Sequence, residues 1–269
     1  MKINCENCNA VISAHQSAVD CGFETTIKNG ISSFTQRDVQ KGSEEVTRDR
    51  QAPGYLQHKK IKSQSKFFDR FVSGIKGTDT LNAEKVVLDL GCGPGPTVKI
   101  LANHGFENIT AIDFSEKSLL LNQQDNSHSK HIKWIQADLR HLAFEPAAAD
   151  VLIMEDFIQH VGTHQDKIAL IKNALGALKP GGHFYLSFFN FNILNYFKGD
   201  LHGTFSNGSI PYERLIPSEI LAVVLEQVTA TRIYPMNITH KYEIDNFMAH
   251  VPFSKYIARM YAFEGIKTK

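Results

Sequence analysis

One short stretch combines an acidic residue with three closely spaced glycines: Asp89, Gly91, Gly93 and Gly95. It directly follows residues 86–88, a short β-branched run that suits a strand buried on both faces. Glycines at alternate positions let the backbone turn tightly and let a ligand approach it closely. Pro96 then suits the first position of a helix, which we expect over residues 97–103. This order of strand, glycine loop and helix predicts a nucleotide-binding α/β domain.

The glycine spacing indicates which nucleotide this loop would bind. A dinucleotide-binding loop has the spacing Gly-x-Gly-x-x-Gly, whereas this chain has Gly-x-Gly-x-Gly, which disfavours a nicotinamide-dependent reductase. The loop and its preceding acidic residue resemble motif I of the class I S-adenosylmethionine-dependent methyltransferases. The resemblance implies S-adenosylmethionine as the cofactor, with these residues in its binding site: Asp89, Gly91, Cys92, Gly93 and Gly95.

Two further aspartates follow the next two predicted strands. Asp113 ends the strand predicted over residues 109–113, where a carboxylate can accept hydrogen bonds from both ribose hydroxyls, and Phe114 could pack on the adenine. Asp138 follows the strand predicted over residues 132–136. By resemblance to the family, Asp138 would bind the adenine amino group and the Leu139 backbone a ring nitrogen. The alternative for Asp138 is a structural role as a loop cap.

The fourth predicted strand, residues 150–154, leads into Glu155, Asp156 and His160. Ligands of open α/β sheets bind outside the carboxyl ends of the strands, so this loop should face both the methyl donor and the acceptor. His160 is the first candidate for a catalytic base, because the unperturbed pKa of histidine is near neutrality. The alternative is a histidine at a helix entry with no chemical role. Asp156 is a second catalytic candidate, and Glu155 would line the cofactor cavity.

The fold class predicted is α/β. The resemblance covers residue 86 to the C-terminus and implies a Rossmann-like, seven-stranded methyltransferase sheet with helices on both faces and an antiparallel last strand. The later elements predicted are a helix from Thr163 to Leu178, strands at residues 183–189, 228–234 and 261–268, and helices at residues 218–226 and 252–259.

The N-terminus contains a Cys-x-x-Cys pair, Cys5 and Cys8, and a third cysteine, Cys21. Two thiolates at this spacing are a common half of a zinc site. Residues 1–34 resemble the small zinc ribbons that precede some bacterial methyltransferases, but Ala18 stands where those have a fourth cysteine. His15 would complete a three-cysteine, one-histidine zinc site. The alternative is a β-hairpin that has lost its metal.

Residues 35–80 are predicted to form a linker, up to residue 54, and then a helix over residues 55–75. In many small-molecule methyltransferases a helix in this place covers the cofactor, and Tyr55 and Phe68 could do so in this chain. Residues 81–269 would form the S-adenosylmethionine-dependent methyltransferase domain.

The composition narrows the function further. A formal net charge of +1 over 269 residues gives no general field that would attract nucleic acid. No apolar run is long enough to span a membrane, so we expect a cytoplasmic enzyme without a membrane partner. The prediction is methyl transfer to oxygen or nitrogen of a small-molecule acceptor. Two alternatives remain open: an RNA base methyltransferase and a non-catalytic, methyltransferase-like adaptor. The oligomeric state does not follow from the sequence.

Overall fold

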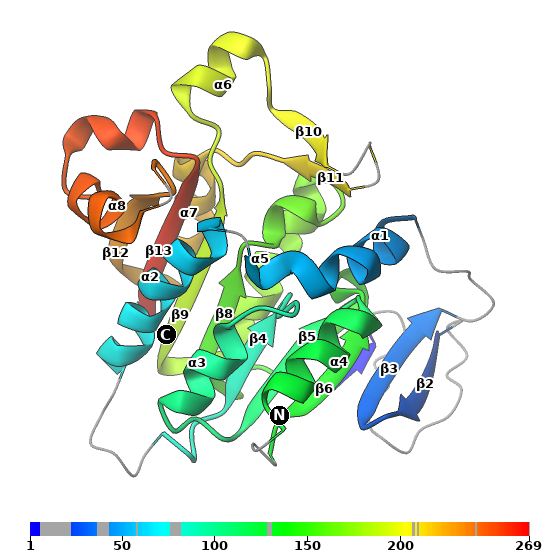
Figure 1. Ribbon diagram of the computed structural model, residues 1–269. Helices are drawn as coiled ribbons and strands as arrows, with labels where there is room; N and C mark the ends of the chain where they lie inside the picture. The colour runs from blue at the N-terminus through cyan, green and yellow to red at the C-terminus, as the bar shows by residue number, and fades with distance from the viewer. Residues whose placement is uncertain are drawn as a thin grey trace.

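A mixed β-sheet of nine strands runs through the centre of the molecule (Figure 1). The computed structural model describes residues 1–5, 23–36, 43–57, 59–75, 82–127, 131–205, 208, 210–239 and 241–268. The strand order is β12-β13-β9-β8-β4-β5-β6-β3-β2. The first seven strands of this order form the predicted methyltransferase-type sheet, so the predicted fold class is confirmed.

The elements have the following bounds. The strands are β1 (Ile3–Cys5), β2 (Phe23–Lys28), β3 (Ile31–Gln36), β4 (Val87–Leu90), β5 (Ile109–Asp113), β6 (Lys133–Ala137), β7 (Leu142–Phe144), β8 (Ala149–Glu155), β9 (Leu178–Phe189), β10 (His202–Phe205), β11 (Ile210–Glu213), β12 (Val228–Met236) and β13 (Met260–Lys267). The α-helices are α1 (Ser43–Gln51), α2 (Lys59–Ile75), α3 (Thr97–Asn103), α4 (Glu116–Asp125), α5 (His164–Ala177), α6 (Ile193–Lys198), α7 (Pro217–Leu225) and α8 (Tyr242–Met248). Short 3-10 helices are η1 (Ala52–Gln57), η2 (Leu139–His141), η3 (Ile158–His160) and η4 (Pro252–Tyr256).

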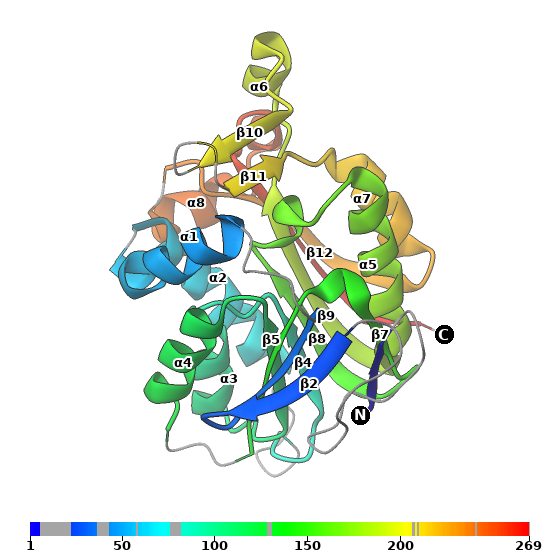
Figure 2. The same ribbon diagram turned by 90° about the vertical axis from the view of Figure 1, so that its right-hand side faces the viewer.

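The sheet has an apolar cluster on each face because its central strands are buried on both sides. In β8, Val151 and Ile153 belong to one cluster, and the alternate residues Leu152 and Met154 belong to the other. Successive side chains of a strand point to opposite faces, so one apolar run supplies both clusters. Figure 2 shows α2, α3 and α4 covering one face and α5 and α7 the other.

The parallel core strands place their carboxyl ends along one edge of the sheet. Strand β4 pairs in parallel with β5 and β8, and β6 pairs in parallel with β5. Strand β13 enters antiparallel between β9 and β12, as predicted for the end of the sheet. Ser115 caps α4, and Thr163 with Asp166 forms a capping box that starts α5. These caps fix where each helix begins behind its strand.

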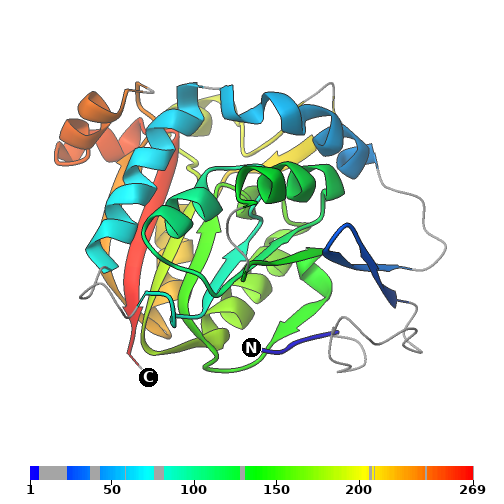
Figure 3. The same ribbon diagram turned by 60° about the horizontal axis from the view of Figure 1, so that its bottom comes forward.

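The N-terminal strands are part of the main fold. Strands β2 and β3 form an antiparallel hairpin, as expected, but β3 also pairs in parallel with β6 and extends the central sheet. Figure 3 shows this blue hairpin at the edge opposite the red β13. Strand β1 pairs separately with β7. The division of the chain at residue 34 stays a prediction.

Three local predictions were wrong. The predicted linker contains α1, which starts with Glu44 and Glu45 and ends with Arg48 and Arg50, a charge order that favours a helix. The predicted helix at residues 252–259 is a 3-10 helix, preceded by α8, which the prediction missed. Helix α7 begins at Pro217 after Ile216, not with a Ser218 cap. For α1, the nearby Gly42, Pro53 and Gly54 were given too much weight, whereas for α7 the proline at its first position, Pro217, was given too little.

None of the helices in the described part of the chain is long and apolar enough to cross a membrane.

Candidate active site

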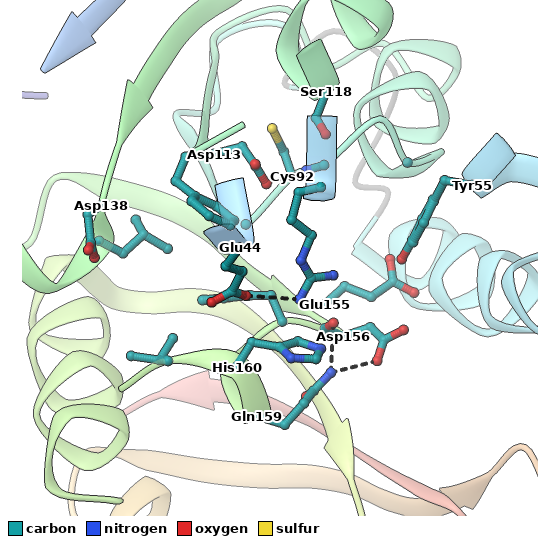
Figure 4. Close-up of a pocket in the computed structure, with 18 of the residues that line it drawn as sticks. Glu44, Tyr55, Cys92, Asp113, Ser118, Asp138, Glu155, Asp156, Gln159 and His160 are labelled. Carbon is teal, nitrogen blue, oxygen red and sulfur yellow. Dashed lines mark hydrogen bonds and ion pairs between the residues drawn. The ribbon is translucent and has the colours of Figure 1, made fainter. Parts of the chain in front are cut away.

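A cavity of about 770 Å³ opens at the carboxyl ends of β4, β5, β6 and β8. This volume is in the range typical of small-molecule sites. All but one of the predicted cofactor residues line it, as do both catalytic candidates: Gly91, Cys92, Gly93, Gly95, Asp113, Phe114, Asp138, Leu139, Glu155, Asp156 and His160. Figure 4 shows that labelled members of this set converge on one space from different elements.

The glycine loop needs its glycines for two different reasons. Gly91 has a φ of +67°, and a Cβ atom there would stand 2.3 Å from the Phe157 ring. Gly93 has a φ of +52°, which a residue with a side chain rarely adopts. The amides of Gly91 and Cys92 both donate to the Ile112 carbonyl, at 2.8 and 3.0 Å. The loop is therefore fixed to β5 before any ligand binds.

Asp113 is buried and held by backbone donors on both sides. Its Oδ2 accepts from the Gly93 amide and its Oδ1 from the Ser115 amide, each at 2.9 Å. Burial raises the pKa of Asp113, while the two amides and the Arg48 cation oppose that rise. Each carboxylate oxygen has more than one lone pair, so both can accept a further hydrogen bond from a ligand.

Asp89 is the predicted cofactor residue that does not line the cavity. It is 1% exposed, and its Oδ2 accepts from the Thr97 hydroxyl at 2.8 Å, which ties β4 to the start of α3. Burial raises the pKa of Asp89 to about 7, with Thr97 opposing the rise and Asp113 adding to it. Asp89 supports the loop from beneath. The Cys92 thiol, also buried, has a pKa raised by burial and by the same two aspartates.

Asp138 has the structural role considered for it, as a loop cap, and it also lines the cavity. It caps the 3-10 helix that begins at Leu139 by accepting from the Arg140 amide at 3.0 Å. The Arg140 guanidinium also pairs with both of its carboxylate oxygens. Burial raises the pKa of Asp138, but these donors outweigh it, so the pKa is lowered. Asp138 is therefore ionised near neutral pH.

Asp156 is held in an unusual backbone conformation. Its φ is +54°, and its amide donates to the Ser187 hydroxyl at 3.0 Å. The Gln159 amide nitrogen donates to the Asp156 carbonyl at 2.8 Å and to its carboxylate at 2.9 Å, as Figure 4 shows. Gln159 is buried and was missed by the sequence analysis, although it directly precedes His160. It fixes the carboxylate at the cavity wall.

His160 is oriented by the hairpin β10–β11. Its Nδ1 lies 2.8 Å from the Pro211 carbonyl oxygen, which can only accept, so Nδ1 carries a hydrogen. In the neutral ring the lone pair is therefore on Nε2. The ring packs edge-on against Phe189 and Tyr212, at centroid distances of 5.9 and 6.4 Å. These contacts favour one tautomer and one orientation.

The opposite side of the cavity is built by segments that the motif analysis did not include. Helix α1 contributes Glu44 and Arg48, which pair at 3.4 Å. Tyr55 also lines the cavity; burial raises the pKa of its hydroxyl, as do Asp156 and Glu155. Tyr55 had been predicted as a covering residue, but Phe68, predicted with it, is fully buried against Tyr185 and lies outside the cavity.

The hairpin β10–β11 completes this side. Lys167 of α5 is 1% exposed, and its Nζ donates to Glu213 at 2.8 Å and to the Gly162 carbonyl at 3.0 Å. His164 Nδ1 lies 3.3 Å from the other Glu213 oxygen. These contacts join β11 to the start of α5. The spacing of Glu44 and Arg48 could have revealed α1, but no local signal links residues 202–213 to the cavity.

The charges around the cavity favour a cationic ligand. Among the described residues that line it there are six carboxylates and three lysine or arginine side chains: Glu44, Asp113, Asp138, Glu155, Asp156 and Glu213 against Arg48, Arg140 and Lys167. S-adenosylmethionine carries a sulfonium cation, a ribose and an adenine. The buried Asp113 suits the ribose hydroxyls, the glycine loop leaves its backbone accessible to the ligand, and the acidic excess suits the sulfonium cation. The residues present therefore fit this cofactor.

The predicted metal site cannot be judged from the described residues. Cys8, His15 and Cys21 lie outside them, and Cys5 is buried in β1. Within the part of the chain that is described, no group of three or more His, Cys, Asp or Glu residues could hold a metal ion. A zinc site at Cys5, Cys8, Cys21 and His15 stays a prediction.

Comparison with known proteins agrees with this geometry. Residues 88–186 match a family model described as a methyltransferase domain. The chain superimposes with a TM-score of 0.54 on an S-adenosylmethionine-dependent methyltransferase from Mesorhizobium loti, at 15% identity and covering 73% of this chain and 95% of the other. This is the class I methyltransferase fold. The matched residues 88–186 contain the glycine loop, Asp113, Asp138 and the loop before α5.

Two curated relatives are similar to parts of this chain. A ubiquinone biosynthesis O-methyltransferase from Idiomarina loihiensis is 32% identical over 167 residues, 56% of this chain and 65% of the relative. YqeM of Bacillus subtilis is 38% identical over 97 residues, 36% of this chain and 39% of the relative. The chain thus spans less than two thirds of the length of these relatives. The N-methyltransferase NodS from Bradyrhizobium japonicum, solved with S-adenosylhomocysteine, shares the fold with a TM-score of 0.51 at 13% identity, over 77% of this chain and 88% of NodS.

Proposed function

We propose that this protein is an enzyme that transfers a methyl group from S-adenosylmethionine to an oxygen or nitrogen of a small-molecule acceptor. The observation that carries the proposal is the cavity itself. One continuous space joins the glycine loop, the carboxylates after β5 and β6, and His160 beside the hairpin. Cofactor and acceptor could therefore meet within it.

The cofactor-binding role falls to the sheet side of the cavity. Asp113 would accept hydrogen bonds from the ribose hydroxyls, because both of its oxygens are already oriented by backbone amides. Phe114 and Leu139 would flank the adenine, with Asp138 at its amino group. Gly91, Gly93 and Gly95 leave the backbone open to the ligand. Cys92 and Glu155 line the same part of the cavity. When bound, S-adenosylmethionine supplies an electrophilic methyl group on sulfur.

The enzyme's own contribution is orientation and proton removal. Holding the acceptor in line with the methyl carbon and sulfur can lower the barrier by roughly 7–11 kcal/mol. Nε2 of His160 would accept the proton that an acceptor hydroxyl loses, while Nδ1 keeps its hydrogen bond to Pro211. Asp156, fixed by Gln159, would position the acceptor from the other side. The hairpin and α1 exclude water by covering the cavity.

Two observations favour hydroxyl oxygen as the methyl acceptor. A hydroxyl must lose a proton, and His160 is held in the tautomer that can take one. The Idiomarina relative, at 32% identity, is named as an O-methyltransferase. A neutral amine would need less help from a base, so nitrogen acceptors remain the second class within the proposal.

The proposal is tested in two steps. Isothermal titration with S-adenosylmethionine should show micromolar binding to the full chain. Transfer of a radiolabelled methyl group is then measured on a panel of phenols, catechols such as 3,4-dihydroxybenzoate, and small amines. Labelled product from at least one member supports the proposal, and the product's methylated atom distinguishes oxygen from nitrogen. An absence of cofactor binding would overturn it.

A further inference from the structure

Helix α6 presents its apolar side chains to solvent. Four of its six residues are large and apolar, none of the six is buried, and Tyr196 and Phe197 are 67% and 77% exposed. In Figures 1 and 2 the helix projects from the carboxyl edge of the sheet, away from the body of the molecule. Burial in the chain's own core therefore does not explain these side chains.

The exposed helix is well capped at both ends. The Asn192 side chain accepts from the backbone amides of Leu194 and Asn195, at 3.0 and 3.1 Å. The backbone amide of Asn192 in turn donates to Oδ1 of Asn195. Gly199 ends the helix in the left-handed conformation with a φ of +63°. Such caps stabilise a helix too short to form alone. The capping residues thus stabilise a helix none of whose own side chains is buried.

A second exposed apolar segment is attached to the base of α6. Phe253 and Tyr256 of η4 are 64% and 48% exposed. The Asn192 and Asn190 side chains both donate to the Ala258 carbonyl, at 3.0 and 2.9 Å, which joins the two segments. We call the exposed set on both segments the apolar rim: Ile193, Leu194, Tyr196, Phe197, Phe253 and Tyr256.

The charged residues of the two segments that carry the apolar rim are mainly cationic. In residues 190–201 and 251–259 the cations are Lys198, Lys255 and Arg259, and the one carboxylate is Asp200. Asp200 pairs with a fourth cation, Arg214, at 2.9 Å. With three cations and one carboxylate these two segments carry a net charge of +2, whereas the whole chain carries +1. An anionic partner surface would be complementary to these segments.

We propose that the apolar rim docks the protein onto the surface of an anionic lipid bilayer. Aromatic and aliphatic side chains bordered by lysines are the composition of segments that lie in the interface of a membrane. Tyrosine suits this place because its ring is apolar and its hydroxyl is polar. The helix is too short to span a bilayer, so the contact is peripheral. Insertion of Phe197 and Leu194 supplies apolar contact, and Lys198 and Lys255 meet lipid phosphates.

The position of the apolar rim would bring the bilayer close to the cavity. Helix α6 leads through Gly199 into β10, whose first residue, His202, lines the cavity. The bilayer surface would therefore lie beside the segment that covers the acceptor side. An acceptor with an apolar part could pass from lipid to the cavity without crossing water. The docking itself goes beyond the proposed methyl transfer and does not depend on it.

The test is flotation of the full chain with lipid vesicles on a density gradient. Vesicles of phosphatidylcholine with 30% phosphatidylglycerol should carry the protein upward, and vesicles of phosphatidylcholine alone should carry much less. The double variant Tyr196→Ser, Phe197→Ser should lose at least tenfold in bound fraction at limiting lipid. Lys198→Glu should lose a smaller part, and only on anionic vesicles.

Leu225→Ser is the matched control, because Leu225 is 52% exposed at the end of α7, outside the rim. It should bind vesicles as the wild type does, and circular dichroism should show that all variants are folded. Two outcomes would overturn the proposal: no binding of the folded wild type to anionic vesicles, or binding that the double variant retains. Self-association that depends on Phe197, without vesicle binding, would identify a second copy of the chain as the occupant and would also overturn it.

Discussion

The two sides of the cavity are built in different ways. The sheet side consists of the loops after β4, β5, β6 and β8, and its buried Asp113 is oriented by the backbone amides of Gly93 and Ser115. The covering side consists of α1, Tyr55 and β10–β11, and is held by side-chain pairs such as Lys167 with Glu213. A site that must bind one constant cofactor can use backbone donors, because they follow from the fold. The covering side depends on individual side chains and can change with the acceptor.

His160 joins the two sides, and its removal should have the largest effect. His160→Gln loses the proton acceptor at Nε2, so we expect the transfer rate to a hydroxyl acceptor to fall by about 10²–10⁴-fold. The affinity for S-adenosylmethionine should stay within about threefold, since the cofactor contacts lie on the sheet side. Initial rates and calorimetry measure the two quantities. His141→Gln, outside the cavity, is the control; a variant rate near that of the wild type would show that His160 is not the base.

Asp113 tests the sheet side alone. Asp113→Ala removes a carboxylate with two oriented oxygens, and charged hydrogen bonds contribute about 1.5–3 kcal/mol each. We expect the affinity for S-adenosylmethionine to fall about 100-fold or more in titration calorimetry. Asp125→Ala, an exposed site on α4, should not change it. Equal affinity of the Asp113 variant and the wild type would exclude Asp113 as the ribose ligand.

Substitution of Asp89 measures how much the burial of this carboxylate lowers the free energy of unfolding. Its pKa is about 7 in the folded protein, above the value near 4 of an unfolded aspartate. The folded protein therefore keeps a proton that the unfolded chain releases, and the contribution of Asp89 to wild-type stability falls as the pH rises from about 4 through 7. Asp89→Asn cannot ionise and keeps an acceptor for Thr97. Relative to wild type, the variant should gain about 2–4 kcal/mol in unfolding free energy between pH 4 and pH 8.

Urea unfolding at several pH values measures this difference. Other titrating groups are common to both proteins and cancel in the comparison. A stability difference that is constant with pH would mean that Asp89 does not titrate in this window.

Arg48 measures how much the covering side influences the sheet side. Its cation lowers the pKa of Asp113, so Arg48→Met should raise that pKa and move the loss of cofactor binding at low pH to higher pH. We expect the ratio of variant to wild-type dissociation constants to increase as the pH is lowered. Arg50→Met, exposed on the same helix, is the control. A ratio that does not change with pH would show that Arg48 does not influence the pKa of Asp113.

The sequence predicted the sheet side well because its signals are local. The boundaries of α3 and β5 agree with prediction, since apolar runs, glycines and caps lie within the elements that they define. The sequence did not show that Asp89 lies outside the cavity, because a motif gives the order of residues and not which of them point into the cavity. The ligand contacts of the sheet-side residues remain predictions, as do the roles of Asp156 and His160.

The covering side could not be predicted in the same way. The short strands β10 and β11 have no strong alternation, and their position depends on distant contacts with α5 and η3. Helix α1 is almost wholly polar, and flanking glycine and proline residues concealed it. The exposure of the apolar residues of α6 could not be predicted either, because a sequence does not show which apolar side chains stay in solvent.

The hydrogen bond between His160 and the Pro211 carbonyl ties the base to the hairpin β10–β11. If the hairpin lifts to admit an acceptor, the ring loses the contact that selects its tautomer. In the proposed mechanism, Nε2 of His160 would thus be oriented to take a proton only while the hairpin covers the cavity. Methyl transfer would then be limited to an acceptor that the closed site already holds.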